Sequence, residues 1–397
     1  MIVRKIQFDE WLFATAAGLS LFGVVMVYSA SAPMAAQQGS PYYFMIKQAV
    51  WTGIGMMGLF AGLLIDYHRL NDRRIVYGSI LLLVLLLLVV LEFPRINGAH
   101  RWIRFRGFSM QPSELAKTAL ILFLAHFLSR RLELYGVRPV KDAVYELPFF
   151  RGFVPCLFVT GLLAGLIVIE PDLGTALMLC AACLILTLIS GVRLRYLLMA
   201  SAPALLGVLS LLVFVPWRMK RLVMFLDPWA DPQGSGYQVV QSLIAVGTGG
   251  TGGAGFAGGK QKFFFLPFAH SDFIFSVIGE ELGLIGAAVV ILLFGLLLWR
   301  GLRISLRAPD AFGMLLGIGI VTMIVTQALL NISVVLSLVP TKGIPLPFIS
   351  YGGSSIVPML FSIGVLLNIS RYSNLDGGLI KEEVHSTAVR STAFRRN

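Results

Sequence analysis

Three carboxylates near one predicted helix are the residues best suited to chemistry. Asp272 lies where a long polar loop gives way to an apolar stretch, and Glu280 and Glu281 follow within that stretch. At 1.5 Å per residue, the two glutamates lie about 12 Å deeper along a helix than Asp272. An ionised carboxylate inside a membrane helix is costly unless it faces a partner or a wet cavity. We therefore interpret Asp272 as the candidate reactive acid, and Glu280 and Glu281 as cavity acids.

Two of the outer acids also have purely structural interpretations. An acid in the first turn of a helix is stabilised by the helix dipole, which lowers the pKa of its carboxyl group. A general base near neutral pH needs the opposite effect, a pKa raised by burial, and the sequence does not say which effect dominates at Asp272. In the turn Glu170-Pro171-Asp172, we expect Asp172 to cap the helix that follows.

The composition places these acids in a membrane protein. Of 397 residues, 57% are hydrophobic and 13% are charged, and the mean hydropathy is +0.83. Uninterrupted apolar runs such as residues 80–90 (ILLLVLLLLVV) are typical of membrane-spanning helices. The formal net charge of +12 is spread over short loops, which indicates membrane topology and anionic lipid rather than nucleic acid.

The three cysteines do not indicate a metal centre. All of them lie in apolar runs, and Cys180 and Cys183 have C-x-x-C spacing. No second pair or nearby histidine completes a zinc-type site, so we interpret the cysteines as small packing residues. The type of metal, if the protein uses one, is not predicted by the sequence.

The hydropathy pattern predicts an all-α polytopic fold with about ten transmembrane helices. We place them at residues 11–31, 44–65, 76–94, 113–129, 152–170, 172–191, 196–216, 272–299, 311–336 and 354–369. Residues 1–371 then form one transmembrane domain, and residues 372–397 form a polar tail. Most lysines and arginines lie in loops that share a side with the termini, so the positive-inside rule places both termini in the cytoplasm.

Several cations on the opposite, outer side run against this preference. Arg101 and Arg104 lie in the loop before the fourth helix, and Lys342 lies in the loop before the tenth. Such side chains can anchor a protein among lipid headgroups, or they can bind an anionic group. We favour an anion site, because the same loops contain clusters of glycine, proline and aromatic residues.

The predicted outer loop of residues 217–271 is much longer than the others. It contains two candidate short helices, at residues 217–226 and 237–246, and a glycine-rich run at residues 247–259 (GTGGTGGAGFAGG). The glycine-rich run could bind phosphate through backbone N–H groups, but it lacks the strand, helix and lysine of a nucleotide-binding loop. A flexible hinge explains the run at least as well.

Polar residues also surround the start of the fourth predicted helix. Glu114 and Lys117 are three residues apart and can form an ion pair. At an exposed helix end the pair would contribute about 0.3–0.5 kcal/mol, whereas in a membrane cavity it would mark a substrate path. The spacing does not distinguish these alternatives. The neighbouring members of this candidate site are Trp102, Gln111 and Ser113.

The segment of residues 340–355 cannot be helical through its middle, because it contains three prolines. Irregular backbone near membrane depth is tolerated only against protein or a wet cavity. Lys342, Ser350 and Tyr351 of this segment are therefore candidate cavity residues. A plain outer loop is the alternative, and the apolar character of the segment weakens it.

Taken together, these segments resemble the SEDS family of shape, elongation, division and sporulation proteins, over about residues 11–370. The motifs occur in the same order and at matching spacing, which makes the resemblance specific. They are residues 25–31 (VMVYSAS), 101–102 (RW), 111–114 (QPSE), 171–175 (PDLGT), 231–238 (DPQGSGYQ), 272–275 (DFIF) and 279–283 (GEELG). Residues 340–343 (PTKG) and 350–355 (SYGGSS) resemble the division branch of the family more than the elongation branch.

The resemblance implies a peptidoglycan glycosyltransferase that polymerises lipid II at the division septum, in the bacterial cytoplasmic membrane. Asp272 matches the family's proposed catalytic base, which would take a proton from the 4-hydroxyl of the acceptor sugar. That oxygen would attack the donor's anomeric carbon with inversion and displace undecaprenyl pyrophosphate.

The resemblance also implies the cofactors and partners. Basic side chains or a divalent cation, Mg²⁺ or Mn²⁺, would stabilise the leaving group, and no organic cofactor is implied. The implied partners are a class B penicillin-binding protein transpeptidase of the FtsI type and other membrane proteins of the division machinery.

Departures from the family pattern are local. Phe268 stands where the family has a glutamate, and Ala257 and Gly259 replace two usual residues of the preceding motif. These changes put in doubt a role for that glutamate, but not for Asp272. The alternatives are a lipid II flippase, an elongation-type polymerase and a scaffold that only recruits the transpeptidase. We favour the enzyme, because the reactive acid and the cations cluster on the outer side, whereas a flippase needs a path to both faces.

Overall fold

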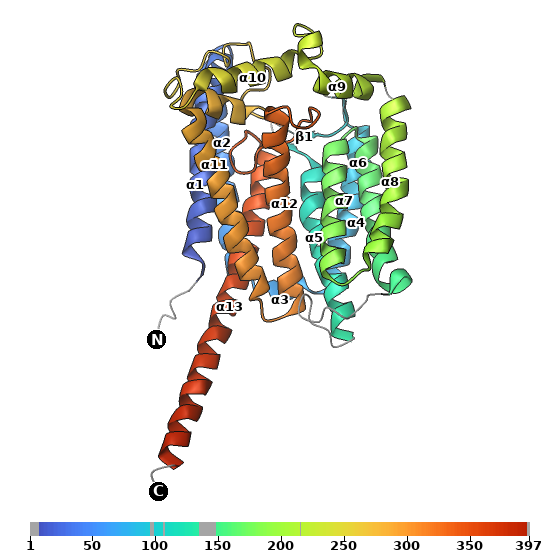
Figure 1. Ribbon diagram of the computed structural model, residues 1–397, viewed down its shortest axis with the longest axis vertical. Helices are drawn as coiled ribbons and strands as arrows, with labels where there is room; N and C mark the ends of the chain where they lie inside the picture. Colours follow the sequence, from blue (N-terminus) through green and yellow to red (C-terminus); the bar gives the residue numbers. More distant parts are fainter. Residues whose placement is uncertain (1–7, 96–98, 106–107, 135–147, 215, 395–397) are drawn as a thin grey trace.

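The long helices form one bundle across a membrane. The computed structural model describes residues 8–95, 99–105, 108–134, 148–214 and 216–394. Each of the ten predicted spans corresponds to a helix in Figure 1, so the all-α fold is confirmed. The helices are α1 (Glu10–Ala36), α2 (Tyr43–Leu64), α4 (Arg73–Val89), α5 (Pro112–Leu134), α6 (Val154–Ile169), α7 (Leu173–Ile189), α8 (Leu194–Phe214), α11 (Ile274–Leu306), α12 (Ala311–Val335) and α13 (Gly353–Phe394). Seven of the described helices are long and apolar enough to cross a membrane, so the protein is a multi-pass membrane protein.

Shorter elements cover the two ends of the bundle. They are α3 (Tyr67–Leu70), η1 (Val90–Glu92), β1 (Ile103–Phe105), β2 (Phe108–Met110), η2 (Phe149–Phe153), α9 (Pro216–Leu226), η3 (Pro228–Ala230) and α10 (Tyr237–Gly249). Strands β1 and β2 pair antiparallel, with Arg104 opposite Ser109. Figure 1 shows α9 and α10 lying across one end of the bundle, which we call the outer side. Both correspond to helices that the sequence predicted within the large outer loop.

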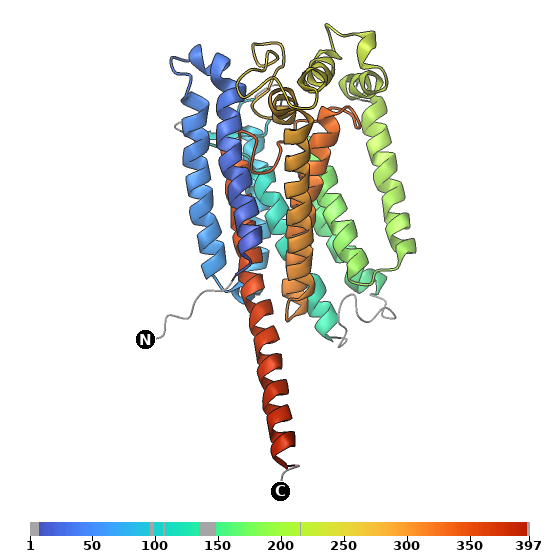
Figure 2. The same cartoon turned by 60° about the vertical axis from the view of Figure 1, so that its left-hand side comes forward.

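The two ends of the described chain lie on the opposite side. Helix α1 begins there, and α13 leaves the bundle on the same side and continues well beyond it (Figure 2). The membrane-spanning part of α13 ends at Ser373, close to the predicted end at residue 369, but the helix itself continues to Phe394. Hydropathy detects only the apolar part of a helix, and the sequence becomes polar after Arg371 although the helix continues.

Helix α12 lies at the centre of the bundle. Most of its residues are buried, and it packs against α5, α7, α11 and α13. Next to it, α2 and α13 approach closely along small residues. A Cβ atom at Gly364 would lie 2.1 Å from the carbonyl oxygen of Leu59, so this crossing requires glycine. Such small-residue contacts replace the hydrophobic driving force that helices lack inside lipid.

The glycine-rich run packs into a break in α11. Gly283 has φ 64° and ψ −163°, which interrupts the helix. Residues 250–255 fill the gap, because Gly255 donates its N–H to the carbonyl of Glu281 (3.0 Å) and Leu284 donates to the carbonyl of Gly250 (2.9 Å). The run is therefore docked on α11 and pairs its exposed backbone groups, which a buried break in a helix requires. In this structure it is neither a phosphate loop nor a free hinge.

Candidate active site

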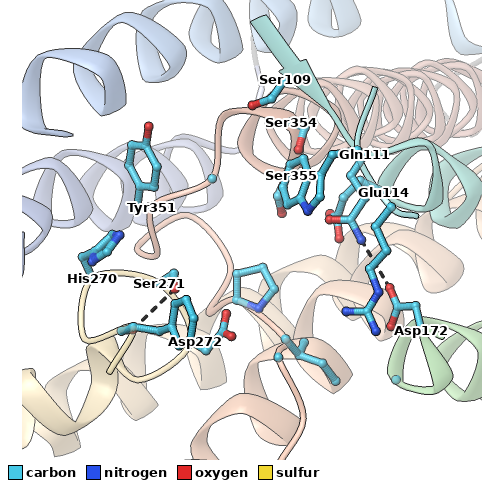
Figure 3. Close-up of a pocket in the computed structure, with 18 of the residues that line it drawn as sticks. Ser109, Gln111, Glu114, Asp172, His270, Ser271, Asp272, Tyr351, Ser354 and Ser355 are labelled. Carbon is cyan, nitrogen blue, oxygen red and sulfur yellow. Dashed lines mark hydrogen bonds between the residues drawn. The ribbon is translucent and has the colours of Figure 1, made fainter. Parts of the chain in front are cut away.

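A cavity of about 1240 Å³ lies on the outer side of the bundle. Its walls come from α2, the β1–β2 hairpin, the turn between α6 and α7, α9, and the segments that precede α11 and α13. The predicted site residues that line it are Arg101, Trp102, Arg104, Gln111, Glu114, Asp272, Lys342 and Tyr351. Figure 3 shows Asp272 between two groups of these side chains, with Tyr351 on one side and Gln111 and Glu114 on the other.

The backbone around Asp272 is fixed from α12 and from the segment before α13. Asn331 of α12 donates from Nδ2 to the carbonyl oxygens of Asp272 (2.8 Å) and Ile344 (2.7 Å). Ser350 donates from Oγ to the carbonyl oxygen of Ser271 (2.6 Å). Ser350 is buried by this contact and does not line the cavity, so its predicted place among the cavity residues is wrong. These bonds pre-orient the loop that carries the acid.

The electrostatic environment of Asp272 suits a base. Asp272 precedes Phe273, the N-cap residue of α11, and so lies outside the first helical turn in which the sequence placed it. Burial raises the pKa of Asp272 to about 6, the positive charges of Arg101 and Arg221 lower it, and the negative charge of Asp172 raises it. A carboxylate with this pKa is mostly ionised at neutral pH and is more basic than an exposed one.

Gly343 allows the segment before α13 to pass against the acid. A Cβ atom at position 343 would lie 2.9 Å from Oδ2 of Asp272, closer than real Cβ contacts allow. The close approach places the preceding residue, Lys342, in the cavity wall. Burial lowers the pKa of the Lys342 ammonium group, and the negative charge of Asp172 acts in the opposite direction.

Two arginines of the hairpin region form a basic side of the cavity. Arg101 donates from Nε to the carbonyl oxygen of Glu170 (3.1 Å) and from Nη2 to that of Pro171, which fixes its guanidinium group on the turn between α6 and α7. Arg104 projects from β1 and is exposed. The Glu170 side chain is wholly buried, and burial followed by the charge of Asp172 raises its pKa to about 8. Glu170 is therefore mostly protonated at neutral pH and does not neutralise Arg101.

Some polar residues next to the basic side stabilise the fold rather than face the cavity. Asp172 caps α7 as predicted, accepting from the Thr175 N–H at 3.2 Å, and it also lines the cavity. Gln111 donates from Nε2 to Asp172 Oδ2 (3.2 Å) and to Ser113 Oγ (2.9 Å). Ser113 is wholly buried beneath Gln111 and does not line the cavity, so its predicted cavity position is wrong. Trp102 lines the cavity directly.

Glu114 and Lys117 form the predicted ion pair, with Lys117 Nζ 2.8 Å from Glu114 Oε2. Only Glu114 lines the cavity. Lys117 turns toward α12 and donates to Gln327 Oε1 (2.6 Å), where it lines a small separate pocket. The prediction that Lys117 shares the cavity with Asp272 is wrong, because its buried ammonium group is held by Glu114 and Gln327.

The prediction of Glu280 and Glu281 as cavity acids is also wrong. Both are almost completely buried and accept hydrogen bonds from protein groups instead of facing water. Glu280 accepts from the backbone N–H groups of residues 260–261 (2.6 and 3.2 Å). Glu281 accepts from Lys262 Nζ (2.7 Å) and from Ser29 Oγ (2.7 Å). The docked loop supplies the partners, and the sequence gives no sign that it folds back on α11.

Other cavity residues were not singled out from the sequence. Arg221 of α9 lines the cavity and donates from Nη1 to the carbonyl oxygen of Thr341 (3.2 Å). Its position among the basic residues of the outer loops could have identified it as a candidate from the sequence. Asn331, which fixes Asp272, has no such signal because it lies within an apolar helix. Aromatic residues of α2 also reach the cavity, including Tyr43, and only the folded arrangement brings them there.

The outer cavity contains carboxylates but no assembled metal cluster among the residues described. No group of three His, Cys, Asp or Glu side chains in the described ranges is placed to hold a metal ion. Asp272 and Asp172 both line the cavity, and the negative charge of Asp172 raises the pKa of Asp272. A metal there would need further oxygen ligands from substrate or water.

Comparison with known proteins identifies the family. The model of the FtsW/RodA/SpoVE family, described as cell cycle proteins, matches residues 9–375. The chain belongs to this family. It is 41% identical to stage V sporulation protein E of Bacillus subtilis, over 94% of this chain and 100% of that protein. It is 42% identical to the probable peptidoglycan glycosyltransferase FtsW of Geobacter metallireducens, over 92% of this chain and 95% of that protein.

The fold comparison agrees with the sequence comparison. A chain from the solved structure described as "Structural coordination of polymerization and crosslinking by a peptidoglycan synthase complex" matches with a TM-score of 0.74 and 31% identity. The match covers 93% of this chain and 99% of that one. The family relationship therefore extends over the whole membrane domain, including every wall of the cavity.

Proposed function

We propose that this protein is a peptidoglycan glycosyltransferase that polymerises lipid II into glycan strands at the division septum. Relatives named as probable FtsW glycosyltransferases are about 40% identical over more than nine-tenths of the chain. The observation that carries the proposal is the position of Asp272. It is a partly buried acid with a pKa of about 6, in a large outer cavity that is also lined by several cations.

In the proposed reaction Asp272 acts as general base. Its carboxylate takes the proton from the 4-hydroxyl of the acceptor sugar as that oxygen attacks the anomeric carbon of the donor. The bond from the anomeric carbon to the pyrophosphate breaks with inversion, and undecaprenyl pyrophosphate leaves. Asn331 and Gly343 position the carboxylate through the backbone and through close packing.

The basic side of the cavity supplies the electrostatic stabilisation. Negative charge grows on the departing pyrophosphate, and Arg101, Arg104, Arg221 and Lys342 line the wall that would receive it. Arg101 is anchored on the turn between α6 and α7 and Arg221 on the carbonyl of Thr341, which reduces reorganisation during the reaction. Trp102 and Gln111 complete this wall.

A divalent cation such as Mg²⁺ or Mn²⁺ is compatible with the residues present. Asp172 would be its carboxylate ligand, together with phosphate oxygens of the substrate, which leaves Asp272 free to act as the base. The cation would supply additional positive charge for the leaving group. The side chains named above bind and orient the substrate and move the proton.

The family match also supports a proposed partner and location. A match to a chain of a peptidoglycan synthase complex supports a class B penicillin-binding protein, of the FtsI type, as the cross-linking partner. The proposal places both termini in the cytoplasm and the cavity on the outer face of the bacterial inner membrane, consistent with the distribution of Lys and Arg.

Polymerisation of purified lipid II by the full chain with its partner tests the proposal. Wild-type protein should produce glycan strands, and Asp272→Asn should fold and insert normally but produce none. An Asn variant that polymerises at the wild-type rate would contradict the role of Asp272. A flippase would show lipid II transfer across vesicles without strand formation, and that transfer would survive in Asp272→Asn.

A further inference from the structure

The wall of the cavity away from Asp172 is aromatic. Phe44 of α2 packs with His270 (ring centroids 4.8 Å apart) and forms T-shaped contacts with Tyr351 (5.2 Å) and Tyr43 (5.1 Å). All four side chains line the cavity. Figure 3 shows Tyr351 and His270 on one side of Asp272, with Asp172 on the other.

This aromatic wall differs in charge from the basic side. Burial lowers the pKa of His270 to about 4, so its ring is neutral at physiological pH. Lys47 is the cation at this wall, and it donates to the hydroxyl of Tyr43 and lies 4.2 Å from the ring centroid. Apart from this residue, the wall offers ring faces and hydroxyl groups rather than charge. Such surfaces suit ligands with apolar faces and polar edges.

The chemistry assigns the two walls to different substrates. In an inverting transfer the attacking oxygen and the leaving pyrophosphate lie on opposite sides of the anomeric carbon. The cations favour the pyrophosphate of the donor on the side of Asp172. The attacking 4-hydroxyl then enters from the opposite side, past His270 and Tyr351, and reaches Asp272 as it loses its proton.

We propose that Tyr43, Phe44, His270 and Tyr351 form the acceptor subsite, where the aminosugar ring carrying the 4-hydroxyl packs its C–H face on the aromatic rings. This inference rests on the proposed glycosyltransferase function and divides its cavity into two binding sites. The new bond joins the acceptor oxygen to the donor anomeric carbon. The bond from that carbon to pyrophosphate breaks with its electron pair, and the proton passes to Asp272.

A single-transfer assay separates the two sites. The donor probe is lipid II with its 4-hydroxyl removed, which cannot act as acceptor. The acceptor probe is the disaccharide-peptide as a methyl glycoside, which has no pyrophosphate to lose. The full chain with its class B penicillin-binding protein receives both probes, and release of undecaprenyl pyrophosphate is followed while one probe is varied at saturating levels of the other.

Removal of an aromatic ring from this wall should raise the KM for the acceptor probe and leave the KM for the donor probe unchanged. Tyr351→Leu should raise the KM for the acceptor probe about tenfold, the size expected for one lost aromatic contact, and leave the donor KM unchanged. Tyr351→Phe keeps the ring and should preserve most acceptor binding. Arg104→Gln should show the reverse pattern, with a raised donor KM only.

Tyr42 provides the matched control for Tyr43. It is adjacent in sequence, stacks on Tyr28 at 5.4 Å, and does not line the cavity. Tyr43→Leu should raise the acceptor KM, whereas Tyr42→Leu should not. The subsite is overturned if Tyr351→Leu raises the donor KM instead, or if the Tyr42 and Tyr43 variants behave alike. Absence of any transfer by wild-type protein would instead contradict the glycosyltransferase function itself.

Discussion

Lys262 and Glu281 form a buried ion pair on the outer side of the bundle, with Nζ 2.7 Å from Oε1 and the side chains 3% and 0% exposed. Lys262 also donates to Ser29 Oγ (3.1 Å), which joins α1 to the pair. Asp272 follows Lys262 in the same loop, ten residues later. The pair therefore fixes the start of the loop that carries the reactive acid, and Asn331 fixes its end.

Removal of one partner from this pair should destabilise the protein strongly. Lys262→Met removes the cation that pairs with Glu281 in a buried position, which we expect to lower the free energy of unfolding by about 3–5 kcal/mol. Thermal unfolding in detergent would measure the loss. Lys260→Met is the matched control, because Lys260 is exposed and contributes only its backbone N–H to Glu280. Equal melting temperatures for the two variants would contradict a structural role of the pair.

Asn331 should affect the reaction beyond its effect on stability. Asn331→Ala removes both hydrogen bonds to the backbone at Asp272 and Ile344, and each buried bond lost costs about 1–3 kcal/mol. The loosened carboxylate should lower kcat as well as the melting temperature.

Asn368 provides the comparison for Asn331. It donates in the same way to the carbonyl oxygen of Leu63 (2.7 Å), at the opposite end of the bundle. Asn368→Ala should lower the melting temperature to a similar extent, with little change in kcat per folded molecule. If kcat falls equally in both variants, Asn331 stabilises the fold without specifically positioning Asp272.

The sequence predicted the helices and most of the cavity, but not how the polar groups inside are paired. Arg101 and Lys342 could be placed because positive charge on the outer side of a membrane protein is unusual, and Asp272 because a carboxylate beside a membrane helix is costly. Lys117 and Glu281 carry the same signal, yet each finds its partner on a distant segment, Gln327 or Lys262. Spacing along a helix shows which residues share a face. It does not show which face packs against a segment that is distant in the sequence.

Gly343 should be required for the geometry of the acid. A Cβ atom at this position would lie 2.9 Å from Asp272 Oδ2, so Gly343→Ala must displace the carboxylate or the backbone. We expect kcat to fall by about a hundredfold, since small displacements of a catalytic group have effects of this size. Gly247→Ala is the control, because a Cβ atom there meets no atom within 4 Å. Normal polymerisation by Gly343→Ala would show that the site tolerates the displacement.

The pH dependence of polymerisation should report the charge environment of Asp272. The base must be ionised, so kcat/KM should rise with pH through a midpoint of about 6 and level off above it. Arg221→Gln removes a positive charge that lowers the pKa of Asp272, so the midpoint should move up. Asp172→Asn removes a negative charge that raises this pKa, so the midpoint should move down. Shifts in the same direction for both variants would assign the midpoint to another group.

The raised pKa of Asp272 also predicts a stability effect with a definite sign. An acid whose pKa is 3.8 when unfolded and about 6 when folded binds protons more tightly in the folded state. The free energy of unfolding therefore falls as pH rises from about 4 to 6, and the full cost remains at neutral pH. Asp272→Asn carries no charge and should melt at a higher temperature than wild type at pH 7.5, with the difference vanishing near pH 4. An Asn variant that melts lower at pH 7.5 would show that the ionised carboxylate is stabilised by its surroundings, and the acid would then be too weak a base for the proposed role.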